Sequence, residues 1–122
     1  GTYESQHTEA SIALMPWGGS KGPAWDVYQR LVHNGEKIGW YYTMFLNPLP
    51  TKLLEDLKSK DLVIVPELNY QGQFSSVLRS YGVRAESLTQ YTGLPFKVSE
   101  LMDLVLGRLN LENSILTERL QE

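Results

Sequence analysis

The chain has 122 residues, of which 42% are hydrophobic and 20% charged, with a formal net charge of −3. This length and composition are typical of one soluble globular domain with a single core. Charges of both signs are mixed along the chain, which argues against a nucleic-acid-binding face, and the lack of cysteine excludes disulfides, zinc–thiolate sites and iron–sulfur ligation by this chain.

The apolar runs and the start of the chain bear on where the protein resides. No apolar run reaches the roughly 18 residues needed to cross a membrane. The first residues, GTYESQHTE, lack the basic and apolar regions of a signal peptide. We therefore expect a soluble cytoplasmic protein without a membrane partner. Because the chain starts with Gly1 and not methionine, we also expect it to be a fragment of a longer protein.

The elements expected in the first half alternate between strand and helix. Residues 10–17 predict a short apolar strand that ends in the turn GGSKGP. Pro23 suits the first position of the following helix, with Asp26 in its first turn and Gly35 as its left-handed C-cap. The aromatic run at 37–46 predicts a second strand, which the segment NPLP ends.

The second half continues this alternation. Thr51 can cap a short helix, and the apolar run at 62–67 predicts a strand that is buried on both faces. The next helix ends at Gly82 and has an apolar face at helical spacing, made of Phe74, Val77, Leu78 and Tyr81. Residues 84–91 predict a weaker strand. Ser99 can cap a final helix, whose end is expected to fray and whose apolar face is Leu101, Leu104, Val105 and Leu109.

This order predicts an α/β fold: a three-layer αβα sandwich around a mostly parallel sheet with right-handed crossovers. The strands at 37–46 and 62–67 are expected at the centre of the sheet because both are strongly apolar. Trp40, Tyr41 and Tyr42 alternate between the two faces of one strand, so we expect them to pack under helices in the core.

The turn GGSKGP has two readings. Glycines before a helix N-terminus can cradle a phosphate, which makes Gly18, Gly19, Ser20 and Gly22 candidate phosphate-binding residues. The turn matches neither of the familiar glycine-rich phosphate motifs. A tight strand-to-helix turn that needs glycine dihedrals explains the same residues, and it is the reading that we favour.

A polar cluster follows the third strand, where a helix is about to begin. Glu67, Asn69, Gln71 and Gln73 can satisfy the turn's backbone groups, face a partner, or place Glu67 as an acid or base. No reacting partner for Glu67 is evident. His7 and His33 have no companions at metal-ligand spacing. The residues alone therefore predict no catalytic, cofactor-binding or metal-binding residue.

Two stretches carry a family resemblance. VIVPELNYQGQFSSVLRSYGV and QYTGLPFKVSEL resemble the transketolase C-terminal-like domain that ends the alpha subunit of 2-oxoacid:ferredoxin oxidoreductases. PWGGSKGPAWDVYQRLVHNGEKIGW and FLNPLP resemble the family's G-S-x-x-G-P turn and L-x-P-L-P segment. One departure is that two residues, not one, separate the Asn and Gly of the E-x-N-x-G-Q pattern, which lengthens that turn. The matched residues are Glu67, Asn69, Gly72, Gln73, Leu78, Arg79, Gly93, Pro95, Phe96, Glu100 and Leu101.

The resemblance implies that residues 1–122 form one domain, whose five-stranded sheet gains a short antiparallel edge strand near 3–6. It implies a structural and subunit-contact role, without catalysis by the isolated domain. The candidate turn and interface residues are then Glu67, Asn69, Gly72, Gln73, Arg79, Gly93, Pro95 and Phe96.

The whole enzyme, by this resemblance, oxidatively decarboxylates a 2-oxoacid to an acyl-CoA and passes the electrons to ferredoxin. The form of the NPLP segment favours 2-oxoglutarate over pyruvate. Thiamine diphosphate, Mg²⁺ and an iron–sulfur cluster are implied for the remaining alpha-subunit domains and a thiamine-binding beta subunit. Two other classes stay open: a domain of a transketolase or 2-oxoacid dehydrogenase, and an α/β module that binds nucleotide or phosphate.

Overall fold

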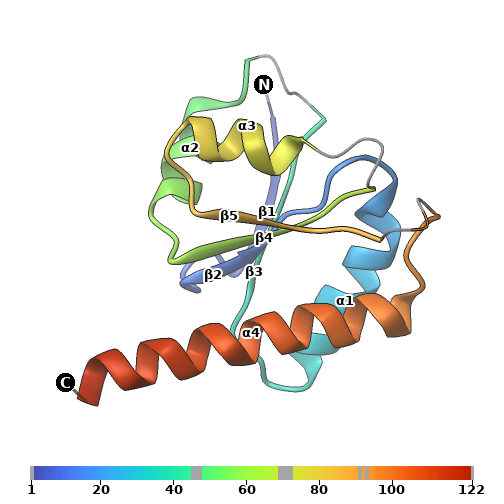
Figure 1. The fold of residues 1–122 in the computed structure, drawn as a ribbon. Coiled ribbons are helices and arrows are strands. Elements are labelled where there is room, and N and C mark those ends of the chain that lie inside the picture. The colour runs from blue at the N-terminus through green and yellow to red at the C-terminus, as the bar shows by residue number, and fades with distance from the viewer. Residues whose placement is uncertain (1, 45–47, 69–72, 91, 93, 122) are drawn as a thin grey trace.

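The computed structural model describes residues 2–44, 48–68, 73–90, 92 and 94–121. Within these residues, strands and helices alternate along the chain (Figure 1). The elements are β1 (Glu4–Gln6), β2 (Ile12–Leu14), the 3₁₀ helix η1 (Gly18–Ser20), α1 (Lys21–His33), β3 (Gly39–Tyr42), α2 (Thr51–Lys58), β4 (Leu62–Pro66), α3 (Phe74–Ser80), β5 (Ala85–Leu88) and α4 (Val98–Gln121).

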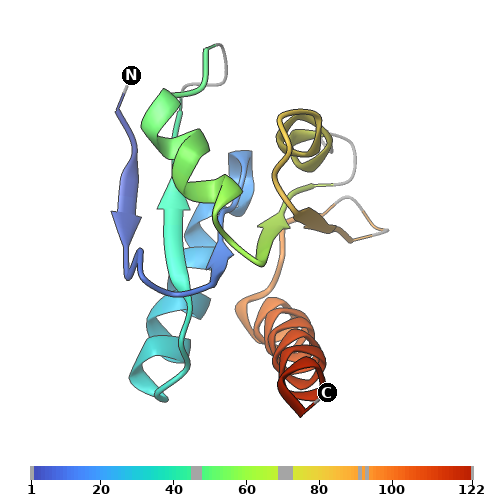
Figure 2. The same ribbon diagram turned by 90° about the vertical axis from the view of Figure 1, so that its left-hand side faces the viewer.

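The sheet has the strand order β1-β3-β2-β4-β5. Among the strands that the structure describes, only the β1–β3 pair is antiparallel. Figure 2 shows α1 and α4 on one side of the sheet and α2 and α3 on the other. The expected αβα sandwich with an antiparallel edge strand is therefore confirmed. Across the described segments, no helix is long and apolar enough to cross a membrane.

The central strand differs from the prediction. The strands predicted at 37–46 and 62–67 are both interior, as β3 and β4, but β2 lies between them. All three residues of β2 are buried. The sequence run that contains β2, IALMPW, is as continuously apolar as the run at 62–67, so apolar content alone does not decide which strand lies in the middle.

Two separate cores form on the two faces of the sheet, and β4 contributes to both. Leu62 and Ile64 pack with α1 and α4, whereas Val63 and Val65 pack with α2 and α3. This confirms the strand that was predicted to be buried on both faces. Trp40 and its neighbour Tyr41 likewise divide between the two cores, as their alternation predicts.

The helix starts lie one or two residues from their predicted places. Helix α1 begins at Lys21, so Pro23 is its third residue and Asp26 lies beyond the first turn. Proline is tolerated there because the first amides of a helix have no intrahelical acceptor. The cap predictions for Thr51 and Ser99 were wrong. Thr51 is the first residue of α2 after Pro50, and Ser99 is the second residue of α4.

Two predicted helix faces include one residue too many. Tyr81 lies just beyond the end of α3 and is 48% exposed, and Leu104 is 42% exposed. The buried face of α4 consists of Leu101, Val105, Leu109 and Glu112. Leu104 lies beside this face and not in it.

The glycines that end α1 and α3 behave as predicted. Gly35 has φ +85° and donates its amide to the Val32 carbonyl. Gly82 has φ +91° and donates to the Arg79 carbonyl. Both therefore occupy the left-handed position that glycine reaches without a steric penalty.

Candidate functional site

The carboxyl ends of β2 and β4 bring together the two turns that the sequence singled out. The Trp17 amide donates to the Pro66 carbonyl at 3.1 Å, and the Trp17 ring stacks on Phe74 with centroids 4.5 Å apart. A Cβ on Gly19 would lie 3.6 Å from the Leu68 side chain. The crossovers leave β2 and β4 in opposite directions, toward β3 and β5. Open α/β sheets bind ligands and partners at such a switch point.

Glu67 directly follows β4 and caps the start of α3. Its side chain is 0% exposed. Oε1 accepts hydrogen bonds from the amides of Gln73 at 2.8 Å and Phe74 at 3.0 Å, and Oε2 accepts one from Ser75 at 3.2 Å. Both carboxylate oxygens are thus used by the backbone. This arrangement suits a fixed anionic cap and leaves no accessible oxygen for acid or base chemistry.

Gln73 combines an exposed side chain with a strained backbone. Its φ is +147°, in a region that non-glycine residues rarely occupy. The hydrogen bond from its amide to Glu67 helps to hold this conformation. Such strain is concentrated at functional positions. Asn69, Gly72 and Gly93 lie outside the described residues.

The other candidate interface residues have different surroundings. Arg79, near the end of α3, donates to the Ala85 carbonyl at 3.0 Å and to the Ser76 hydroxyl at 2.9 Å, which ties α3 to β5. Phe96 is buried in the core beside α4. Pro95, next to it, is exposed. Of these residues, Arg79 and Pro95 are exposed, and the Arg79 guanidinium is already bonded to α3 and β5.

The turn GGSKGP folds into η1 and the start of α1. Gly18 has φ +62°, which explains one glycine without any ligand. The amides of Ser20 and Lys21 donate to carbonyls within the turn, those of Trp17 and Gly18. Ser20 is buried, and its hydroxyl has no hydrogen-bond partner among the residues that the structure describes.

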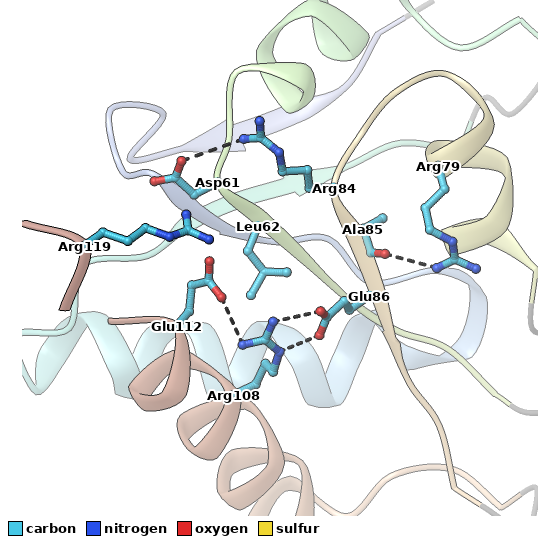
Figure 3. A pocket seen from close by; sticks show the side chains of 9 residues that line it. All are labelled: Asp61, Leu62, Arg79, Arg84, Ala85, Glu86, Arg108, Glu112 and Arg119. Atoms are coloured by element: carbon cyan, nitrogen blue, oxygen red, sulfur yellow. Dashed lines mark hydrogen bonds and ion pairs between the residues drawn. The ribbon is translucent and has the colours of Figure 1, made fainter. Parts of the chain in front are cut away.

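Sequence reasoning missed a cluster of arginines at β5 and α4 (Figure 3). Arg108 donates to Glu86 at 2.8 Å and to Glu112 at 3.2 Å. The hydrogen bond from Arg108 lowers the pKa of Glu86 below its usual 4.5. The Arg108–Glu112 spacing of four residues was a readable signal, but nothing in the sequence points to Glu86. Four of the chain's five arginines line this hollow of about 510 Å³: Arg79, Arg84, Arg108 and Arg119.

The donor groups present do not fit a metal ion or an iron–sulfur cluster. In the described ranges, no three His, Asp or Glu side chains gather to hold a metal. The whole chain has no cysteine, the usual ligand of iron–sulfur clusters.

Comparison with known proteins places this α/β domain in an enzyme family. No model of a protein family matches the chain. It is 36% identical over 94 residues to the 2-oxoglutarate oxidoreductase subunit KorA of Mycobacterium tuberculosis, covering 76% of the chain and 14% of that protein. It is 30% identical over 103 residues to the alpha subunit of 2-oxoacid:ferredoxin oxidoreductase 1 of Aeropyrum pernix, covering 80% of the chain and 16% of that subunit.

A solved structure agrees with these relatives. The 2-oxoglutarate:ferredoxin oxidoreductase from Magnetococcus marinus with 2-oxoglutarate, coenzyme A and succinyl-CoA bound matches with a TM-score of 0.78 and 28% identity. The match covers 89% of this chain and 20% of that one. The chain is therefore homologous to a segment of the alpha subunits of 2-oxoacid:ferredoxin oxidoreductases and shares its fold, which confirms the resemblance seen in the sequence. It spans about one sixth of the length of these curated relatives.

Proposed function

We propose that this chain is a structural and subunit-contact domain, of the transketolase C-terminal-like type, in a longer alpha subunit of a 2-oxoacid:ferredoxin oxidoreductase. The observation that carries the proposal is the 36% identity to KorA over 76% of the chain. The whole enzyme would oxidatively decarboxylate a 2-oxoacid to an acyl-CoA and pass electrons to ferredoxin. The names of KorA and the Magnetococcus marinus enzyme both favour 2-oxoglutarate as the substrate.

The chemistry of the carboxyl-end site supports a contact role over a catalytic one. The carboxylate of Glu67 is buried and is already bound by three backbone amides. Thiamine diphosphate, Mg²⁺ and the iron–sulfur cluster would accordingly be held by the beta subunit and by the rest of the alpha subunit. Glu67 would act by fixing the turn that presents Gln73.

Exposed groups near this end of the sheet are the proposed contact surface. Gln73 projects from its strained turn. Leu94 is 64% exposed and Leu104 is 42% exposed, and both line one hollow together with Pro95. Large apolar side chains that gather in the open are typical of surfaces that another polypeptide covers. The contact surface is therefore defined as Gln73, Leu94, Pro95 and Leu104.

Activity of the longer gene product tests the proposed enzyme class. The complete alpha subunit, produced with its beta subunit, should reduce ferredoxin only when a 2-oxoacid and CoA are both present, and faster with 2-oxoglutarate than with pyruvate. Ketol transfer without CoA would instead indicate a transketolase. Reduction of a dehydrogenase acceptor without ferredoxin would indicate the other thiamine-dependent class, and either result would refute the proposal.

The contact role needs its own measurement. Gln73→Ala in the complete alpha subunit should leave its melting temperature within about 1 °C, since an exposed side chain contributes little to folding. It should weaken co-purification with the beta subunit. Gln29→Ala removes an equally exposed glutamine on α1 and is the matched control. Normal assembly of the Gln73 variant would contradict the contact role.

The phosphate-binding alternative can be tested on the 122-residue chain. A phosphate-binding module would show saturable NMR shifts of the Gly18, Gly19 and Ser20 amides with inorganic phosphate. We expect no such shift at Ser20, because the Ser20 and Lys21 amides already have acceptors within the turn.

A further inference from the structure

The outer side of α4 carries a regular pattern that the core of the domain does not use. Figure 2 shows this helix nearly end-on, with α1 beside it and no other element of the described chain on its outer side. Six residues follow one another there at alternating spacings of four and three, and all six are exposed. This spacing is that of the contact positions of paired helices. We call the row the outer seam; it consists of Glu100, Leu104, Gly107, Leu111, Ser114 and Glu118.

Two large apolar side chains stand in the outer seam. Leu104 is 42% exposed and Leu111 is 54% exposed, and they lie seven residues apart on the same side of α4. Leu104 also lines the hollow that contains Leu94 and Pro95. The outer seam therefore continues the proposed contact surface along α4. A single exposed leucine is ordinary on a protein surface, so the seam depends on what lies between the two.

The residue between them is a glycine that nothing within the domain explains. Gly107 lies in the interior of a 24-residue helix, where glycine is less favourable than alanine. It does not have a positive φ, and a Cβ built on it would meet no atom within 4 Å. Neither the backbone nor the packing of the described chain therefore requires glycine here. A glycine on a helix surface does allow another backbone to approach closely, and Ser114, the next such position in the seam, is also small.

The charges beside the seam are acidic. Both basic residues of α4, Arg108 and Arg119, line the arginine hollow of Figure 3. The exposed carboxylates of the helix, none of which forms a salt bridge with a described residue, are those of Glu100, Asp103 and Glu118. Lys97, directly before α4, offsets one of these charges. The outer side of α4 therefore keeps a net negative charge, which favours a basic partner.

These charges also decide against a second copy of this chain. In an antiparallel pair of α4 helices, Leu104 would face Ser114 and Leu111 would face Gly107, which fits in size. The same register, however, places Glu100 opposite Glu118 at both ends. A parallel pair places each glutamate opposite its own copy. Since like charges that face each other destabilise a pair, the seam fits a different helix better than its own copy.

We propose that the outer seam binds a basic amphipathic helix of the beta subunit. Large apolar side chains of that helix lie over Gly107 and Ser114, between Leu104 and Leu111, and its lysines or arginines lie near Glu100 and Glu118. An amphipathic helix that lays its apolar face into a groove is a common way of joining two polypeptides. The proposal rests on the proposed function, which supplies the beta subunit as the partner of the contact surface that shares Leu104.

Filling the space over Gly107 tests the close approach. Gly107→Leu in the complete alpha subunit should lower its affinity for the beta subunit by about tenfold or more, measured by biolayer interferometry, because overpacking a close-packed contact is unfavourable. In the 122-residue chain the same substitution should raise the melting temperature by a few degrees, since leucine is the better helix former and nothing crowds the position. Asn113→Leu adds the same side chain on the side of α4 that faces α1 and is the matched control, which should assemble normally.

Reversing one charge tests the basic partner. Glu118→Lys should lower the affinity about three- to tenfold at low salt, and the difference should shrink at about 0.5 M salt, where charges are screened. Glu55→Lys reverses an equally exposed glutamate on α2 and should leave the affinity unchanged.

Several results would overturn the proposal. Gly107→Leu that binds the beta subunit as tightly as Asn113→Leu would show that no helix approaches the glycine, and unchanged or tighter binding by Glu118→Lys would exclude a basic partner. A lower melting temperature of the free alpha subunit carrying Gly107→Leu would place the covering helix within that subunit. Self-association of the 122-residue chain that Gly107→Leu abolishes would make a second copy the occupant.

Failure of this proposal can be told apart from failure of the proposed function. If the enzyme class is wrong, the wild-type complex does not reduce ferredoxin with a 2-oxoacid and CoA. If only the seam is wrong, the wild-type complex reduces ferredoxin, and Gly107→Leu and Glu118→Lys assemble as the controls do.

Discussion

Replacing Glu67 by alanine tests whether one buried carboxylate organises the turn at the end of β4. The substitution removes the acceptor for the amides of Gln73, Phe74 and Ser75. The bonds to Phe74 and Ser75 are buried, whereas Gln73 is exposed and water can replace its lost bond. Two buried donors are therefore left without an acceptor.

The expected destabilisation follows from these two donors. Each buried amide left without an acceptor costs about 1–3 kcal/mol, which gives roughly 2–6 kcal/mol in total. Removing a buried carboxylate also removes its desolvation cost, which offsets part of this loss. We expect a net loss of about 2–4 kcal/mol. At this chain length it corresponds to a melting temperature lower by roughly 10 °C.

Glu67→Gln separates the hydrogen bonds from the charge. The amide oxygen can still accept from Gln73 and Phe74, but its NH₂ group then faces the Ser75 amide, where two donors meet. The loss should therefore be smaller, about 1–2 kcal/mol. Glu55→Ala, an exposed glutamate on α2, is the matched control and should stay within about 0.5 kcal/mol of the wild type.

Thermal and urea unfolding of the four proteins, followed by circular dichroism, measures these differences. The expected order of stability is wild type and Glu55→Ala, then Glu67→Gln, then Glu67→Ala. If Glu67→Ala melts within 1 °C of the wild type, the carboxylate does not organise the turn. If Glu67→Gln is the less stable of the two variants, an amide oxygen kept at this position does not help, and the hydrogen bonds to the three amides do not explain the stability of this turn.

Three further predictions concern groups outside this turn. Arg108→Met should lower the free energy of unfolding by about 1 kcal/mol in urea melts, because its partner Glu86 is half exposed and solvent screens the pair. Arg108 lowers the pKa of Glu86 in the folded state below the unfolded value near 4.5. The stability that this pair contributes is therefore complete above pH 4.5 and is lost as the pH falls through the lowered pKa of Glu86. Urea melts at about pH 3 should accordingly show a smaller difference between Arg108→Met and the wild type. Lys60→Met keeps the apolar stem but leaves the Thr8 and Ala10 carbonyls without their donor, so it should cost about 1–3 kcal/mol, and an unchanged urea midpoint would show that the lysine does not hold the connection between β1 and β2. Burial, and next the charge of Asp56, raise the pKa of Tyr41 to about 12, so folding stability should decline as the pH rises from about 10 to 12, and Tyr41→Phe should show a smaller decline in alkaline melts.

Several features of the fold could be predicted because they depend on local sequence. The run LVIVP indicated a strand covered on both faces, since no polar residue interrupts it. Gly35 and Gly82 marked helix ends, because the left-handed position favours glycine. The predicted caps at Thr51 and Ser99 failed because a hydroxyl near a helix start can cap it or simply be its first or second residue.

The candidate site was only partly predictable. The sequence placed a carboxylate and glutamines where a helix begins, and the structure shows that the Glu67 carboxylate binds the amides of that helix. Phe96 matched a family motif but is a core residue. Arg79 matched the same pattern and binds the backbone of β5. A motif identifies which residues occur together, but not which of them face solvent.

The sequence by itself determined the alternation of strands and helices, the apolar faces and the family, because periodicity and motif order are properties of neighbouring residues. Only the tertiary structure decided that β2 is the middle strand, that Arg108 meets Glu86 across 22 positions, and that Lys60 reaches the carbonyls of Thr8 and Ala10. These contacts join residues far apart in the chain. No local preference encodes them, because each partner's position is fixed by the packing of the whole sheet and its helices.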